Sequence, residues 1–322
     1  MAEYSIGIDI GGTKIAIGIV RRDGHILDYE VHPTPKTSRE DIIELLGKSL
    51  LSFERKARKQ QIPLRGIGIG TAGQINSKEG VIISGTDNIK DWNNVPLKQH
   101  LSQSTSLPIF MDNDANTFAL AEYYLGHGKG VKDMIALTLG TGVGGGVISA
   151  GKLLRGHWGG AAELGHMTVQ MNGPLCNCGS RGCLEMYASG TGIAHRMKEK
   201  ITEERKEISP QISMYQDKTG NLTSKQVFKW YEEGIPEAVS VLDDAIKALA
   251  LGSISLIHTF NPALLVFGGG LVEYHPWLLD RVREKVHVHG IASLVKEVDI
   301  VQSHLGYNTG LIGASLLPWT NQ

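Results

Sequence analysis

The chain has 322 residues, of which 41% are hydrophobic and 20% are charged, and its formal net charge at pH 7 is -1. This composition is typical of a globular protein with two domains. It lacks the basic excess of a nucleic-acid-binding protein, and no run approaches the ~18 apolar residues of a membrane span. We therefore expect small-molecule partners, with neither nucleic acid nor membrane. With no secretory leader at the start, the expected location is cytoplasmic.

Two residue types are distributed unusually. The 40 glycines cluster in short loops beside expected strands, where the missing Cβ lets the backbone approach a ligand closely. The three cysteines, Cys176, Cys178 and Cys183, fall within one short stretch. In a reducing compartment such clustering favours a metal site over a disulfide.

The first part of the chain opens with an expected β-hairpin, whose strands at residues 4–10 and 14–20 enclose the turn Gly11-Gly12-Thr13. Ser38 and Asp41 form a capping signature at the start of a helix whose apolar residues recur at helical spacing. The remaining expectations here are strands at 26–31, 67–70 and 108–111, a turn at 74–76, and helices at 38–59 and 115–125.

The second part restarts with a strand, a glycine-rich turn and another strand, which indicates an internal duplication into two α/β lobes. We expect a smaller lobe at residues 1–118 and a larger one at 119–309, with a helix at about 310–322 packing back on the smaller lobe. The other expected elements are strands at 134–139, 147–149 and 264–267, and helices at 194–206 and 237–260.

Three glycine-rich turns are candidate phosphate sites. The turn after Asp9 can direct backbone N–H groups at phosphate oxygens, and Asp9 is a candidate Mg²⁺ partner through water. A plain hairpin turn without ligand is the alternative. Residues 140–146 form a second loop, with five glycines. The run Gly268-Gly269-Gly270 follows an expected strand and suits the adenosine side of a nucleotide.

Asp114 is the candidate general base. It lies between an expected strand and helix, and ligands of open α/β sheets bind at the carboxyl ends of strands. Transfer of a phosphoryl group to a hydroxyl needs a carboxylate near that hydroxyl. Asn113 is a candidate ligand of a hydroxyl group. The alternative is that Asp114 only caps the helix.

The cysteine stretch predicts a closed Cys₃His zinc site of the structural type, with His166 as the fourth ligand. His157 is an alternative ligand that spacing does not exclude. Glu163 and Glu185 flank this site, and their carboxylates suit bidentate hydrogen bonds to vicinal sugar hydroxyls. We expect the zinc-binding loop to span residues 156–190.

These motifs, in this order, resemble those of the ROK kinases along nearly the whole chain. They are Asp9-Ile-Gly-Gly-Thr-Lys14, the segment Asn113 to Asn116, the glycine-rich run 139–146, Glu163-Leu-Gly-His166 and the stretch Cys176 to Glu185. The resemblance implies the actin-like ATPase (ribonuclease H-like) fold, with two α/β lobes and with ATP and sugar in the interlobe cleft. It also implies ATP, Mg²⁺ and structural Zn²⁺ as cofactors, and a homodimer.

The resemblance assigns each candidate residue a role. Asp114 is the implied catalytic base, and His166 joins Cys176, Cys178 and Cys183 on zinc. The implied sugar-binding residues are Gly73, Asn88, Asn113, Asp114, Glu163, His166 and Glu185. The implied nucleotide- and Mg²⁺-binding residues are Asp9, Gly11, Gly12, Thr13, Lys14, Gly140, Thr141, Gly142, Gly268 and Gly269.

The sequence indicates least clearly which sugar accepts the phosphoryl group. We expect a hexose phosphorylated on its 6-hydroxyl, with glucose first and N-acetylmannosamine or another N-acetylhexosamine as the alternative. Room for an acetamido group beside Gly73, Gln74 and Thr86 would separate the two. The family also includes sugar-responsive repressors with an N-terminal helix-turn-helix. With the first strand expected at Tyr4 and Asp114 present, a non-catalytic regulator is the remote alternative.

Overall fold

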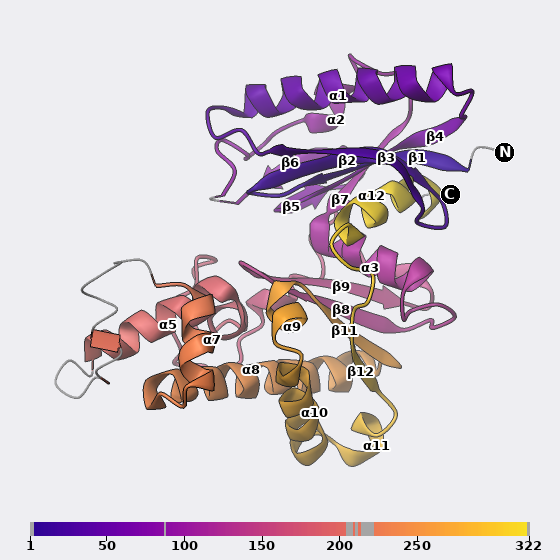
Figure 1. Cartoon of the computed structure of the whole chain (residues 1–322). Helices are drawn as coiled ribbons and strands as arrows, with labels where there is room; N and C mark the ends of the chain where they lie inside the picture. Colours follow the sequence, from indigo (N-terminus) through magenta and orange to yellow (C-terminus); the bar gives the residue numbers. More distant parts are fainter. Residues whose placement is uncertain (1–2, 87, 204–208, 210–211, 214–221, 321–322) are drawn as a thin grey trace. The chain divides into compact units, whose positions relative to one another are not determined.

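A computed structural model describes residues 3–86, 88–203, 209, 212–213 and 222–320 (Figure 1). The chain forms two compact units. Unit 1 comprises residues 1–132, 146–162 and 303–322, and unit 2 comprises residues 133–145 and 163–302. The expected lobe boundary near residue 118 stays a prediction.

The sheet of unit 1 has the strand order β3-β2-β1-β4-β7. The expected hairpin is confirmed, because β1 pairs antiparallel with β2, with Ile10 opposite Ile15. β3 is antiparallel to β2, whereas β4 and β7 continue the sheet in parallel from β1. The strands are β1 (Tyr4–Ile10), β2 (Lys14–Arg21), β3 (Ile26–Pro33), β4 (Leu64–Thr71) and β7 (Ile109–Asn113).

Alternating isoleucine and glycine give this sheet two different faces. The isoleucines of β1, β2 and β4 are buried in one core with helix α1 (Arg39–Lys59). On the other face, a Cβ at Gly7 would come 2.4 Å from Leu311 O of helix α12 (Thr309–Thr320). Glycine therefore lets α12 lie directly against β1 and β4, and the C-terminal helix packs there as well as on α3 (Asp114–Leu125).

The predicted cap of α1 is confirmed, since Ser38 Oγ accepts a hydrogen bond from Asp41 N at 3.2 Å. The expected turn at residues 74–76 is wrong: Gln74–Asn76 forms strand β5, which pairs with β6 (Val81–Ser84). The short run was misjudged because its partner strand, not its own sequence, makes it extended. Helix α2 (Leu97–Leu101) completes this part of unit 1.

The second sheet has the strand order β10-β9-β8-β11-β12, the same succession of strands as the first. Its β9 begins at Val143, so the expected loop at 140–146 is shorter than predicted. Gly146 lies within β9, where a Cβ would come 2.6 Å from Ala119 Cβ. The strands are β8 (Met134–Leu139), β9 (Val143–Ser149), β10 (Lys152–Leu153), β11 (Leu264–Gly268) and β12 (Asp299–Gln302).

The long helix α8 (Pro236–Phe260) organises the helices of unit 2, packing against α4, α5, α7, α10 and α11. It ends at Asn261, whose φ of 44° is left-handed. The helix expected at 194–206 begins earlier, at Gly190, and residues 204–206 lie outside the described residues. The helices are η1 (Leu164–His166), α4 (Glu185–Ala188), α5 (Gly190–Glu203), α7 (Ser224–Glu232), α9 (Gly270–Tyr274), α10 (Trp277–His289) and α11 (Ala292–Val295). Within the described parts of the chain, no helix is both long and apolar enough to cross a membrane.

Candidate active site

The turn between β1 and β2 has its three carbonyl groups tied to the segment that follows β3. Thr34 Oγ1 donates to Gly11 O at 2.6 Å, and Thr34 N donates to Thr13 O at 3.0 Å. Lys36 Nζ donates to Gly12 O. No described residue accepts a hydrogen bond from the N–H groups of Gly12 and Thr13. This backbone leaves two donors for an anion, as phosphate-binding turns do.

Two carboxylates lie beside this turn in unit 1. Burial and the negative charge of Asp114 raise the pKa of Asp9 to about 6, although the ammonium group of Lys14 acts in the opposite direction. Burial also raises the pKa of Asp114, against hydrogen bonds from backbone N–H groups at the start of α3. Lys14 Nζ lies 3.2 Å from the centroid of the Tyr307 ring. Asp9 and Asp114 together can attract a divalent cation, because a cation offsets the cost of burying two negative charges close to each other.

The N-cap of α3 is Asn113. Its Oδ1 accepts hydrogen bonds from Ala115 N at 2.8 Å and from Asn116 N at 3.4 Å. Its Nδ2 donates to Gly73 O at 2.8 Å, which leaves one N–H of the amide for a ligand. The alternative in which Asp114 provides the cap does not hold, although Asp114 Oδ1 accepts from Ala115 N at 2.9 Å.

Asp112, which precedes these residues, is buried and holds the start of α3 in place. Its Oδ2 accepts from Arg155 Nε at 2.6 Å, and its Oδ1 accepts from Asn116 Nδ2 at 2.8 Å and Asn113 N at 2.9 Å. This network was not expected from the sequence, because Arg155 follows Asp112 at a separation of 43 residues. Arg155 Nη2 and Asn116 Oδ1 are buried without a hydrogen-bond partner among the described residues, so the ion pair fixes the geometry of this region more than it adds stability.

Asn88 packs against the same turn. A Cβ on Gly12 would come 2.5 Å from Asn88 Cβ, and Lys36 Nζ donates to Asn88 O at 2.8 Å. Gly73 has a φ of 108°, where glycine is favoured. Unit 1 therefore brings together Asp9, the Gly11–Thr13 turn and Lys14 with four of the predicted sugar-binding residues, namely Gly73, Asn88, Asn113 and Asp114.

The turn between β8 and β9 in unit 2 is built in a similar way. Gly190 N donates to Gly140 O at 2.8 Å, and Thr191 N donates to Thr141 O at 3.4 Å. Within the turn, Gly140 N donates a hydrogen bond to Gly142 O at 3.0 Å. The carbonyl groups of this turn are thus held by the first residues of α5 and by the turn itself.

Glu185 lies directly behind this turn. Its Oε2 accepts from Val143 N at 2.9 Å, and a Cβ on Gly142 would come 2.6 Å from that oxygen. Glu163 precedes η1, and its carbonyl accepts from His166 N at 3.0 Å. Unit 2 therefore contains the remaining predicted sugar-binding residues, namely Glu163, His166 and Glu185.

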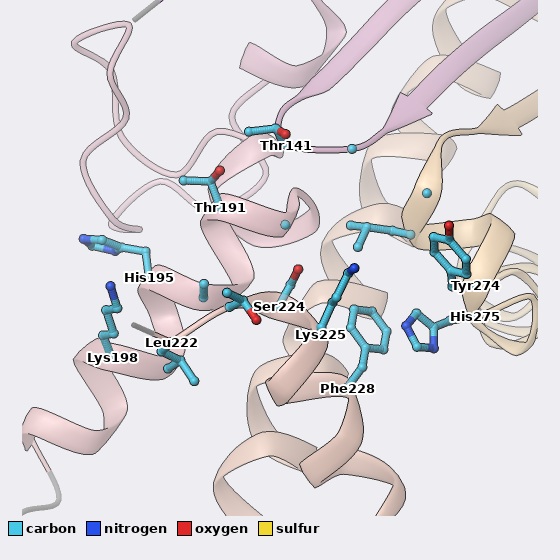
Figure 2. A pocket seen from close by; sticks show the side chains of 16 residues that line it. Thr141, Thr191, His195, Lys198, Leu222, Ser224, Lys225, Phe228, Tyr274 and His275 are labelled. Carbon is cyan, nitrogen blue, oxygen red and sulfur yellow. The ribbon is translucent and has the colours of Figure 1, made fainter. Parts of the chain in front are cut away.

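A cavity of about 480 Å³ borders the second turn (Figure 2). Gly140 and Thr141 line it, as do α5, α7 and α9. Phe228 and His275 stack along one side, with ring centroids 3.8 Å apart and planes 5° from parallel. Burial lowers the pKa of His275, which favours the neutral imidazole. The volume and the flat aromatic side suit a ligand with a planar ring system.

Cationic side chains add a second property to the cavity. Lys198 of α5 and Lys225 of α7 line it, together with His195, and Figure 2 shows Lys198 next to His195 and Lys225 pointing toward the turn that carries Thr141. A site that joins an aromatic side to positive charge matches a nucleotide, whose base is planar and whose phosphates are anionic.

The cavity adds residues to the nucleotide prediction. Gly270 of the run Gly268-Gly269-Gly270 lines it, whereas Gly268 and Gly269 are not among the lining residues, so their nucleotide role stays a prediction. Gly269 has a φ of 91°, and a Cβ there would come 2.5 Å from Leu139 O, so the packing of β11 against β8 also requires glycine at this position. Sequence reasoning missed the lining residues Thr191, His195, Lys198, Lys225, Phe228, Tyr274 and His275. The one available signal was Gly190-Thr191-Gly192, which follows the cysteine stretch.

The cysteine stretch and His166 form a compact cluster in unit 2. Their four ligand atoms all lie within 4.8 Å of one another. Cys176 Sγ is 3.6 Å from His166 Nδ1, and Cys178 Sγ is 3.6 Å from Cys183 Sγ. A tetrahedral zinc ion bound by thiolates and an imidazole would separate such atoms by about 3.6–3.8 Å. The residues therefore fit a tetrahedral cation, and His157 is outside the cluster.

Without a cation the thiols differ in acidity, since a hydrogen bond from the backbone of Ser180 lowers the pKa of Cys178 while the other two pKa values are raised. Burial, with hydrogen bonds and charge from the other two cysteines, raises the pKa of Cys183 to about 12, and burial also raises the pKa of Cys176. Three thiolates at this spacing need a cation to hold their charge. His166 uses Nδ1 in the cluster, which leaves Nε2 for another partner.

The comparisons with known proteins decide the family. The model of the ROK family matches residues 5–320. The chain belongs to the ROK family. Glucokinase from Thermotoga maritima is 37% identical over 311 residues, which cover 96% of this chain and 95% of the relative.

Two solved structures show the same fold. ROK hexokinase from Thermus thermophilus superposes with a TM-score of 0.83 at 31% identity, covering 98% of both chains. A ROK family glucokinase from Streptomyces griseus, in complex with glucose and AMPPNP, gives a TM-score of 0.77 at 33% identity, covering 97% of this chain and 98% of the other. The predicted actin-like ATPase fold is thereby confirmed for this member of the ROK family.

Proposed function

We propose that this ROK protein is an ATP-dependent hexose kinase that transfers the γ-phosphate of ATP to the 6-hydroxyl of glucose. The observation that carries the proposal is the pair Asp9 and Asp114 beside a turn with two outward N–H groups. Full-length similarity to a glucokinase, and to a glucokinase solved with glucose and AMPPNP, supports the same acceptor and donor.

Asp114 is the proposed general base. Burial raises the pKa of its carboxyl group, which brings its basicity closer to the operating pH of a kinase. Because Asn113 caps α3 and holds Gly73, the carboxylate stands at a fixed place at the start of the helix. Asp114 would orient the 6-hydroxyl and accept its proton as the phosphoryl group is transferred.

Each glycine turn has a proposed nucleotide role within its own unit. The cavity beside Gly140 and Thr141 takes the adenosine, with the base against Phe228 and His275. The N–H groups of Gly12 and Thr13 take phosphate oxygens. Asp9 would hold Mg²⁺, which would supply positive charge beside the γ-phosphate. Lys14, next to Asp9, adds a positive charge at the same place.

Each unit has its own polar groups that suit sugar hydroxyls. In unit 1, Asn88 and Asn113 offer amide groups. In unit 2, Glu163 and Glu185 offer carboxylates, and His166 offers Nε2 while its Nδ1 faces the cysteines. Zn²⁺ in the cluster of His166, Cys176, Cys178 and Cys183 would have a structural role only, and it would hold His166 in one ring orientation. A homodimer stays a prediction from the family, and a cytoplasmic location stays a prediction from the sequence.

A coupled assay of ADP release with Mg-ATP tests the proposal on a panel of glucose, mannose, fructose, allose, N-acetylglucosamine and N-acetylmannosamine. Glucose should give the highest kcat/KM. A preference for N-acetylmannosamine would replace the acceptor and leave the chemistry unchanged. Absence of turnover on every sugar, in folded protein, would contradict the kinase proposal and favour a sugar-binding regulator.

A further inference from the structure

The segment after β3 has one lysine that contacts two functional segments. Lys36 is exposed, yet its Nζ donates both to Gly12 O and to Asn88 O, the latter at 2.8 Å. Gly12 belongs to the proposed phosphate turn, and Asn88 belongs to the proposed sugar-binding segment. One ammonium group therefore connects the two segments by hydrogen bonds to backbone carbonyls.

These contacts differ from an ordinary surface lysine contact. An ammonium group on a carbonyl forms a charge-assisted hydrogen bond, stronger than a neutral one. Thr34, two residues earlier, binds the carbonyls of Gly11 and Thr13. With the bond from Lys36, all three carbonyl groups of the Gly11–Thr13 turn accept hydrogen bonds from the segment of residues 34–36. That orientation is what leaves the N–H groups of Gly12 and Thr13 available.

The two segments are also in direct contact. A Cβ on Gly12 would come 2.5 Å from Asn88 Cβ, so Gly12 and Asn88 touch without space for a methyl group. Asn88 N is held by Thr86 Oγ1 at 3.1 Å, whereas no described residue hydrogen-bonds the side-chain amide of Asn88. The amide is free for a ligand, while the backbone of Asn88 is fixed to the turn.

We infer that Lys36 is a positioning residue that couples sugar binding to nucleotide binding. The inference rests on the proposed hexose kinase function. A sugar that binds the Asn88 amide orders the segment around residue 88. Because Lys36 ties that segment to Gly12, the same event orders the phosphate turn, so the nucleotide then binds with less loss of conformational freedom. The coupling is reciprocal, and each ligand should tighten the other.

The test compares Lys36→Met with wild type. Methionine keeps the length and apolar stem of lysine and removes the ammonium group. Lys36→Arg retains a charged donor that can span two carbonyls. Lys90→Met is the matched control, since it removes an exposed lysine two residues from Asn88 that has no hydrogen bond or ion pair with any described residue. Lys36→Gln serves as a second neutral variant should Lys36→Met fold poorly.

Calorimetry measures the Kd of AMPPNP with Mg²⁺, in the presence and absence of saturating glucose or of the panel sugar that wild type phosphorylates. In wild type the sugar should lower the Kd at least ~5-fold, the lower end of typical coupling. In Lys36→Met the ratio should fall below ~2, with Lys36→Arg and Lys90→Met close to wild type.

Two results would overturn the inference. The ratio could persist in Lys36→Met, including the case in which the variant binds AMPPNP equally more weakly with and without sugar, or the ratio could be near one in wild type. Both can occur in an enzyme that turns over hexose normally, so they contradict the role of Lys36 alone. A wild-type protein without hexose turnover would instead contradict the proposed function.

Discussion

The two glycine turns of this protein are alike in construction and different in surroundings. Each joins the first two strands of its sheet, and in each the carbonyl groups are held by hydrogen bonds from the same unit. The Gly11–Thr13 turn is held by residues 34–36 after a strand. The Gly140–Gly142 turn is held by Gly190 and Thr191 at the start of α5.

Their neighbours separate their functions. Asp9 and Asp114 lie beside the first turn, where the proposal therefore has a cation and the reacting hydroxyl. The cavity with Phe228 and His275 lies beside the second turn, where the proposal has the nucleotide base. The two turns are therefore similar in backbone, and the side chains around each turn distinguish their proposed roles.

The largest expected effect concerns unit 2. Cys178→Ser removes one of four ligands from the proposed zinc site, and the free energy of zinc binding adds to folding. Plasma emission spectrometry should find about one zinc per wild-type chain and a large loss in the variant, with a lower Tm. Less than half an equivalent in wild-type protein would contradict the site, and Ser180→Ala in the same loop is the control.

The next effect concerns chemistry at the first turn. Asp114→Ala should lower kcat at least ~100-fold, the scale of losing a general base, and calorimetry should still detect sugar binding. Glu44→Ala, which removes an exposed carboxylate of α1 in the same unit, should leave kcat unchanged. Near-normal turnover of Asp114→Ala would remove Asp114 from the catalytic role.

The buried carboxyl group of Asp9 should also make the free energy of unfolding depend on pH. Folding raises the pKa of Asp9 from 3.8 to about 6, so the folded protein holds this proton more tightly than the unfolded chain. The contribution favours folding at low pH and is lost as pH rises from about 4 through 6. In EDTA, urea unfolding should show Asp9→Asn more stable than wild type at pH 7.5 by up to about 3 kcal/mol.

The same comparison at pH 4 provides the control, since wild type and Asp9→Asn should then differ little. Asp114 contributes a shift in the same direction, so the variant should retain part of the pH dependence. A gap that is equal at both pH values would show that burial of Asp9 does not oppose its ionisation.

The smallest effects separate the two turns kinetically. Gly12→Ala places a methyl group against Asn88 and should raise KM for both sugar and ATP about five- to tenfold. Gly140→Ala meets no atom within 4 Å and extends into the cavity, so it should raise KM for ATP alone. Initial rates over both substrates measure this, and equal effects of the two variants would remove the division between the turns.

The sequence was sufficient wherever the signal is local. The hairpin around Gly11-Gly12-Thr13, the cap at Ser38 and the cysteine cluster depend on residues close in sequence, and the structure has all three.

The parts that sequence could not give depend on distant contacts. The cavity draws its lining from three helices separated by tens of residues, and neither Phe228 nor His275 is unusual in its own segment. The hydrogen bonds of Arg155 with Asp112 and of Lys36 with Asn88 form only when the chain folds. The nucleotide role of Gly268 and Gly269 stays a prediction, because a strand-packing glycine and a ligand-binding glycine look the same in a sequence.

The most direct test of the kinase proposal follows the phosphate itself. Phosphorus NMR of wild-type protein with Mg-ATP and glucose should show the resonances of ADP and glucose 6-phosphate rising together at equal rates. ADP accompanied by inorganic phosphate alone would mean that water is the acceptor. An unchanged ATP spectrum in folded protein would contradict phosphoryl transfer at this site altogether.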